Sequence, residues 1–173
     1  KLWINKSVCV GLTLIVLMAS PFTAKAADQS LGFALSGIVE QVLVKPGQNV
    51  MPGEALVVLD TVRVKARLTA IAAEVKVSKG IADLAARRFD YAQEQFDAVS
   101  LSKVELDTAR INLDEALARL AKAQVRQTIM KWRLDHSTLK AAQKGRIKQI
   151  NAWPGMIVNL RSSNPVIVVL SRP

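Results

Sequence analysis

Residues 37–50 read GIVEQVLVKPGQNV, and residues 145–158 read GRIKQINAWPGMIV. In both stretches a Pro-Gly pair begins nine residues after the leading glycine. The apolar positions between these markers also agree in character. The identical positions are Gly37/Gly145, Gln41/Gln149, Pro46/Pro154, Gly47/Gly155 and Val50/Val158. The sequence therefore contains, twice, a small module of short strands joined by tight turns.

Turn signals place the two halves of this β module at residues 31–60 and 137–170. Pro46-Gly47, Pro52-Gly53 and Pro154-Gly155 each predict a tight turn, because proline fixes φ and glycine supplies a positive φ. We expect very short strands between such closely spaced turns. The residues predicted to shape the turns of the module are Gly37, Pro46, Gly47, Gly53, Gly145, Pro154 and Gly155.

Between the two halves, residues 61–136 show the heptad spacing of two coiled-coil helices. Nearly all residues that recur at alternating steps of three and four are apolar or small. The first seam is Leu68, Ile71, Val75, Ser78, Ala82, Ala85, Phe89, Ala92, Phe96 and Val99. The second is Leu106, Ala109, Leu113, Ala116, Leu120, Ala123, Gln127, Met130 and Leu134. Because the link between them is short, the helices are expected to form an antiparallel hairpin with its tip near residues 97–103.

The start of the second helix carries its own signal. Ser102 is a favourable N-cap residue, and Glu105 three positions later completes a capping box. Acidic residues gather around this tip, whereas lysines and arginines dominate the stretches on either side. These patterns predict an α+β chain in which a helical hairpin is inserted between the halves of an all-β module. At a rise of about 1.5 Å per residue, the hairpin would project on the order of 50 Å.

Residues 1–26 show the three-part pattern of a secretory signal peptide. Lys1 and Lys6 flank a charged start, an apolar run covers residues 8–19, and small residues surround Lys25. The run is too short to cross a hydrocarbon core of about 30 Å, although an uncleaved anchor is the competing interpretation. Cys9 lies inside the run and does not fit a lipoprotein site. The exported chain would hold no cysteine, which leaves neither disulfides nor thiolate metal sites.

The net charge of +10 would suit a nucleic-acid-binding protein. Export argues against that function, because a secreted protein rarely meets nucleic acid. The charge is also polarised along the chain rather than spread evenly. The acidic tip therefore has two interpretations, a solvated loop or a docking surface, and the basic base could face anionic lipid headgroups.

The repeated glycine, valine and Pro-Gly pattern resembles the biotinyl/lipoyl-carrier fold, or barrel-sandwich hybrid. The same module split by a coiled-coil hairpin resembles the periplasmic adaptors (membrane fusion proteins, HlyD-like) of tripartite efflux and secretion systems. The resemblance covers nearly all of Leu31 to Leu170 and rests on the order of the elements. Residues 102–107 also resemble the start of the second hairpin helix in that family. Matching residues are Gly37, Val39, Val42, Gly47, Val50, Gly53, Leu56, Leu59, Asp60, Gly145, Ile147, Gly155, Val158 and Val168.

The resemblance implies a periplasmic subunit associated with the inner membrane that bridges a transporter and an outer-membrane channel. It implies self-assembly into an oligomer, no catalysis and no cofactor. Contacts at the hairpin tip would involve Asp97, Val99, Leu101, Ser102, Lys103, Glu105 and Asp107.

Two features depart from that family. Adaptors usually carry a β-barrel and a membrane-proximal domain, for which the given sequence leaves no room; a fragment and a reduced adaptor are both compatible with this. Many adaptors also carry an Arg and a Leu upstream of the tip serine, where this chain has Tyr91 and Gln95.

Other functions fit less well. Lys65 and Lys140 match neither the biotin nor the lipoate attachment motif, and they do not lie in a turn between the halves. His136 beside Asp135 lacks a nucleophile and is expected to be a hinge or surface residue. Trp153 is expected to cover the core of the β module. The alternative from a different class is a stand-alone exported coiled-coil scaffold that associates without a pump.

Overall fold

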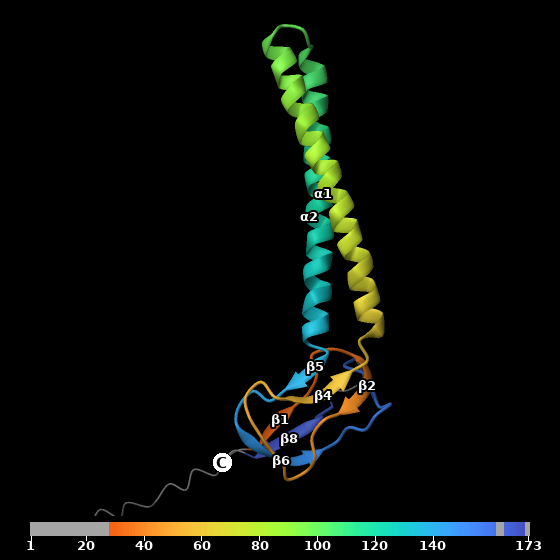
Figure 1. Ribbon diagram of the computed structural model, residues 1–173, viewed down its shortest axis with the longest axis vertical. Coiled ribbons are helices and arrows are strands. Elements are labelled where there is room, and N and C mark those ends of the chain that lie inside the picture. The colour runs from red at the N-terminus through yellow and green to blue at the C-terminus, as the bar shows by residue number, and fades with distance from the viewer. Residues whose placement is uncertain (1–27, 162–164, 172–173) are drawn as a thin grey trace, which may run out of the picture.

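The computed structural model describes residues 28–161 and 165–171. A long helical hairpin stands on a small β module, and its tip lies at the end farthest from the strands (Figure 1). Helix α1 covers Val62–Asp97 and α2 covers Lys103–Asp135. The predicted α+β class and the long helical hairpin are confirmed. At about 1.5 Å per residue, α1 is on the order of 54 Å long.

The strands form two four-stranded sheets, with the orders β1-β8-β6-β3 and β5-β4-β2-β7. All the pairings are antiparallel. The strands before the hairpin are β1 (Gln29–Leu31), β2 (Gly37–Val42), β3 (Asn49–Val50) and β4 (Ala55–Leu59). Those after it are β5 (Thr138–Lys140), β6 (Gly145–Ile150), β7 (Ile157–Val158) and β8 (Val168–Ser171).

The two sheets are built alike, and each takes strands from both halves of the chain. The sequence repeat makes β2 equivalent to β6 and β3 equivalent to β7. Strands β1 and β8 of one sheet then correspond to β5 and β4 of the other. The edge strands of each sheet therefore come from the half that does not supply its central strands. Neither half of the repeat can complete a sheet without the other.

The equivalence extends to the pairing register. Gly37 of β2 pairs with Val158 of β7, and Gly145 of β6 pairs with Val50 of β3, which are the repeat-related positions. The ladder of β2 with β4 shifts between Val39 and Gln41, and the ladder of β6 with β8 shifts between the equivalent Ile147 and Gln149. The two halves thus share even an irregularity in their strand pairing.

The core of the protein lies between the two sheets and is almost purely aliphatic. Repeat-related residues occupy matching places in it: Val39 and Ile147 are each 1% exposed, as are Val50 and Val158. The buried members are Phe33, Val39, Val44, Val50, Leu56, Val57, Leu59, Ala141, Ile147, Val158, Ile167, Val168 and Leu170. The repeated valines and isoleucines stabilise the fold by burying this apolar surface.

The three predicted Pro-Gly turns are confirmed. Gly47, Gly53 and Gly155 have φ values of 83°, 84° and 86°. Each turn is closed by a backbone hydrogen bond to the residue before its proline, such as the one from the Gln48 N–H to the Lys45 carbonyl (3.1 Å). The positive φ at the third position is the signature of a type II turn, and it explains the glycine.

The seam predicted for the second helix is confirmed. Its nine residues are buried or half-buried, and every other residue of α2 is exposed. The seam of the first helix is also confirmed from Leu68 to Phe96, with Val64 extending it toward the base. Val99, however, was wrongly assigned to this seam. It lies beyond the end of α1 and is 92% exposed.

The joint between the hairpin and the β module is held by local hydrogen bonds. The Val62 N–H donates to Asp60 Oδ1 (2.8 Å) at the start of α1. At the end of α2, the Ser137 hydroxyl donates to the Arg133 carbonyl (2.8 Å), and Ser137 is 2% exposed. His136 Nδ1 lies 2.8 Å from the Trp132 carbonyl oxygen, and the two rings stack with centroids 4.3 Å apart.

Three predictions need correction or lie outside the described residues. Trp153 is 62% exposed and does not cover the core; it is the first residue of the Pro-Gly turn, where its carbonyl accepts the Met156 N–H (3.0 Å). The ordered strands begin at Gln29 and end at Ser171, slightly beyond the expected range 31–170. The expected signal segment 1–26 lies outside the described residues. Among those described, no helix is long and apolar enough to span a membrane.

Candidate interaction site at the hairpin tip

The chain leaves helix α1 through a tight reversal that uses two overlapping backbone hydrogen bonds. The Ser100 N–H donates to the Gln95 carbonyl (2.8 Å), and the Val99 N–H donates to the Phe96 carbonyl (2.9 Å). This pair of bonds defines a Schellman motif, in which the residue after the C-cap adopts a left-handed conformation. Val99 occupies that position with φ 56°.

Val99 is an unusual residue for this position, which glycine or asparagine normally fills. A β-branched side chain in the left-handed region is strained, and such strain often marks a functional position. Its side chain is also 92% exposed at the very end of the hairpin. The molecule thus presents an apolar side chain at its tip and holds it in a conformation that costs free energy.

The start of helix α2 is fixed by the predicted capping box. The Glu105 N–H donates to Ser102 Oγ (3.3 Å), while the Ser102 N–H donates to the Glu105 carboxylate (3.0 Å). The Ser102 hydroxyl donates to the same carboxylate oxygen (2.7 Å). These hydrogen bonds from the Ser102 hydroxyl and the Ser102 backbone hold the pKa of Glu105 below its ordinary value.

The structure brings the predicted tip residues together between the end of α1 and the first turns of α2. Asp97 ends α1 and accepts a hydrogen bond from Gln93 Nε2 (3.0 Å). Leu101 is half-buried, whereas Ser102, Lys103 and the two acids that follow are exposed. A partner at the tip would therefore meet two exposed apolar side chains, Val99 and Val104, with charged residues beside them.

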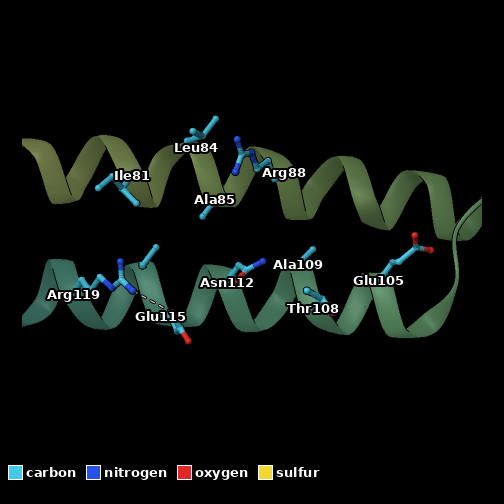
Figure 2. Close-up of a pocket in the computed structure, with 11 residues that line it drawn as sticks. Ile81, Leu84, Ala85, Arg88, Glu105, Thr108, Ala109, Asn112, Glu115 and Arg119 are labelled. Carbon is cyan, nitrogen blue, oxygen red and sulfur yellow. Dashed lines mark hydrogen bonds and ion pairs between the residues drawn. The ribbon is translucent and has the colours of Figure 1, made fainter.

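A groove runs along one side of the hairpin just below the tip (Figure 2). Its volume is about 460 Å³. Small residues of both seams form part of its lining, and Glu105 lies at the end next to the tip link. The lining residues are Ile81, Leu84, Ala85, Arg88, Glu105, Thr108, Ala109, Asn112, Glu115, Ala116 and Arg119. The groove and the tip therefore share Glu105.

The groove combines exposed apolar side chains with charge. Ile81 and Leu84 remain 46% and 42% exposed on α1. On α2, Arg119 forms an ion pair with Glu115 (3.3 Å), drawn as a dashed line in Figure 2. Arg88 on the α1 side has no ion-pair partner among the described residues. Such a surface suits a partner helix that supplies both an apolar face and an acid.

Sequence reasoning missed this groove and a second apolar stripe on α2. Val104, Ile111, Val125 and Trp132 recur at multiples of seven and are all exposed. This heptad position lies opposite the seam and is normally polar. The sequence signal that could have revealed this stripe was the heptad spacing of apolar residues outside the seam. An apolar stripe on the outer side of a hairpin is typical of a surface that contacts another molecule.

The other residues considered for chemistry lie apart from one another. Lys65 is in the first turns of α1, and Lys140 is in the edge strand β5. His136 caps the end of α2. Within the part of the chain that the structure describes, no group of three or more His, Cys, Asp or Glu residues is placed to hold a metal ion.

The fold matches those of solved membrane fusion proteins. The membrane fusion protein Spr0693 from Streptococcus pneumoniae R6 superposes with a TM-score of 0.64 at 19% identity, over 84% of this chain and 59% of its own. ZneB from Cupriavidus metallidurans gives 0.61 at 17% identity, over 87% and 62%. MacA from Actinobacillus actinomycetemcomitans gives 0.58 at 20% identity, over 83% and 48%. No protein-family model matches the sequence.

This chain therefore has the fold of the membrane fusion proteins, or periplasmic adaptors, as the sequence resemblance predicted. It spans about half to three-fifths of the length of the three matched structures. The likeness concerns the architecture of strands and hairpin, because identities near 20% carry no residue roles by themselves.

Proposed function

We propose that this protein is a periplasmic adaptor subunit of an export or efflux complex, and that it bridges an inner-membrane transporter and an outer-membrane channel. The observation that carries the proposal is a long hairpin fixed on a compact two-sheet base with its capped tip exposed. A long hairpin of this kind can connect two partners that lie too far apart for a compact domain to contact both. Its role would be structural rather than catalytic.

The tip is proposed as the contact with the channel. Val99 is strained and exposed, and the capping box keeps α2 ordered up to its first residue. A partner therefore meets a surface that is already organised, which lowers the entropic cost of binding. The groove beside Glu105 extends the same surface along the hairpin. Many adaptors carry an arginine where this chain has Tyr91, so that motif is absent here, and Arg88 lies one turn further from the tip, in the groove.

The two sheets are proposed to form a lipoyl-like domain into which the hairpin is inserted. The duplicated register and the shared irregularity support a common origin of its halves. In this protein the domain would act as a base for assembly, with no attached cofactor. We further propose that the chain is exported by residues 1–26 and works at the inner membrane as an oligomer.

The proposal is tested by placing a photo-crosslinking amino acid at Val99 in the native host and identifying the attached proteins by mass spectrometry. The expected product is an outer-membrane channel protein. The same amino acid at Ala73, an exposed position of α1 far from the tip, serves as the matched control and should not give that product.

An inner-membrane transporter should also co-purify with the tagged protein. If the tip crosslinks only to further copies of this chain, and no transporter co-purifies, the stand-alone scaffold is the better description. Subcellular fractionation completes the test, since cytoplasmic retention of the protein would exclude an adaptor role.

A further inference from the structure

Among the described residues, one ion pair crosses between the two helices, and it shows which positions beside the seam face each other. Arg126 of α2 pairs with Glu74 of α1. Both residues flank the seam at the same type of heptad position. Because the helices are antiparallel, moving one heptad toward the base on each helix gives Arg67 and Arg133. Two positive charges thus face each other where the neighbouring heptad holds an acid and a base. Like charges at these positions destabilise a coiled coil.

Arg67 and Arg133 line a common pocket of about 270 Å³ at the joint between the hairpin and the β module. Arg63 joins them from one turn earlier on α1. Within the described residues 28–161 and 165–171, none of the three arginines has an ion pair or a side-chain hydrogen bond. Arg126 and Arg119 elsewhere on the hairpin do have acid partners.

The pocket contains a single carboxylate, that of Asp60, against three arginines. Asp60 Oδ1 accepts the Val62 N–H at the start of α1 (2.8 Å). The hydroxyl of Ser36, which also lines the pocket, accepts the Leu160 N–H (3.1 Å) and so keeps its own proton available to donate. The remaining walls are apolar. The lining therefore has an excess of donors and positive charge.

We propose that this basal pocket binds a phosphate-class oxyanion through Arg67, Arg133 and Arg63, with the Ser36 hydroxyl as a further donor. Guanidinium groups bind tetrahedral oxyanions through paired N–H donors, and a doubly charged anion would relieve the repulsion between Arg67 and Arg133. The pocket volume exceeds by far the roughly 30 Å³ that one water occupies in the liquid, so a partly hydrated anion fits. The site is independent of the proposed adaptor function.

The test uses the purified full chain and inorganic phosphate at constant ionic strength. Calorimetric titration should show saturable binding, and phosphate should raise the melting temperature above that in chloride. The double variant Arg67→Gln/Arg133→Gln should bind phosphate at least roughly tenfold more weakly and lose the thermal response. Without phosphate it should melt at the same or a higher temperature, because a repulsion has been removed.

The matched control is Arg87→Gln/Arg110→Gln, which removes the same charge from exposed positions of α1 and α2 that lie outside the pocket. It should bind phosphate within about twofold of the original chain. An equal loss in the control, or no saturable binding by the original chain, would overturn the proposal. Arg67→Lys/Arg133→Lys retains the charge and provides a second variant if the glutamine variant does not fold. Its binding should still be weakened.

A second arm separates a free anion from a lipid headgroup. Vesicles of phosphatidylglycerol and of phosphatidylcholine are floated with the protein. A lipid headgroup is the ligand if the protein binds the anionic vesicles, if phosphate competes with that binding, and if Arg67→Gln/Arg133→Gln abolishes it. Calorimetric phosphate binding without pocket-dependent vesicle binding identifies the free anion.

Discussion

Gly145 lies so close to Ser171 that a Cβ atom on Gly145 would come within 2.8 Å of the Ser171 carbonyl oxygen. The contact joins β6 to β8, so the glycine is needed for the close approach of two strands. Gly145→Ala should therefore destabilise the protein by about 1–3 kcal/mol, as overpacking does. Urea unfolding followed by circular dichroism measures the change in the free energy of unfolding.

Gly37 is the matched control for this prediction, because it is the equivalent residue in the other sheet. A Cβ atom there would meet the Leu59 side chain at 3.1 Å, and a side chain can move aside more easily than a carbonyl. Gly37→Ala should cost less than Gly145→Ala. The opposite order would contradict the explanation by backbone contact.

Gly80 in helix α1 should be replaceable with a gain in stability. A Cβ atom at this position meets nothing within 4 Å, and its backbone is helical. Gly80→Ala should raise the free energy of unfolding by about 0.5–1 kcal/mol, because alanine loses less backbone entropy on folding. Thermal unfolding detects this as a higher melting temperature. An unchanged or lower value would contradict the explanation by backbone entropy.

The strain at Val99 predicts a stabilising substitution at the tip. The left-handed conformation costs a residue with a Cβ about 1–2 kcal/mol, so Val99→Gly should stabilise the chain by about 0.5 kcal/mol after the entropy of glycine is deducted. Val104→Gly in the first turn of α2 is the control and should destabilise. If Val99 contacts a partner, its replacement should at the same time reduce formation of the complex in cells.

The capping box at Ser102 predicts a pH dependence of the tip. The pKa of Glu105 is lowered in the folded chain, so the ionised carboxylate stabilises the start of α2. This contribution is present above the unfolded value of about 4.3 and is lost as the pH falls through the lower folded pKa. A carboxyl NMR titration should show the lowered pKa, and Ser102→Ala should move it back up. An unchanged pKa in Ser102→Ala would rule out this cause.

The sequence predicted the elements whose signals are local. Seam residues such as Ala116 and Met130 follow a strict heptad, which predicts coiled-coil helices, and Ser102 with Glu105 forms a motif within four residues. The Pro-Gly turns are equally local, because each proline and glycine sets its own φ. These features hold irrespective of what packs around them.

Other features could not be predicted, and some of them depend on long-range contacts. The exchange of edge strands between the sheets joins residues as distant as Gln29 and Leu170. Val99 fits the heptad spacing, yet it leaves the helix because the backbone bonds of the reversal form at this point. Trp153 was expected to be covered, but turn geometry rather than hydrophobicity decides its exposure. The groove at the tip arises only where two helices meet.

The exchange of strands between the sheets also sets the order of events in folding. The hairpin can form early from local contacts, whereas β4 waits for β5, and β1 waits for β8 at the other end of the chain. We therefore expect the base to become native last, because both of its sheets need strands from either side of the hairpin. If the link between α1 and α2 were cut, the two fragments would still share both sheets, so the folded chain resembles a dimer of its own halves.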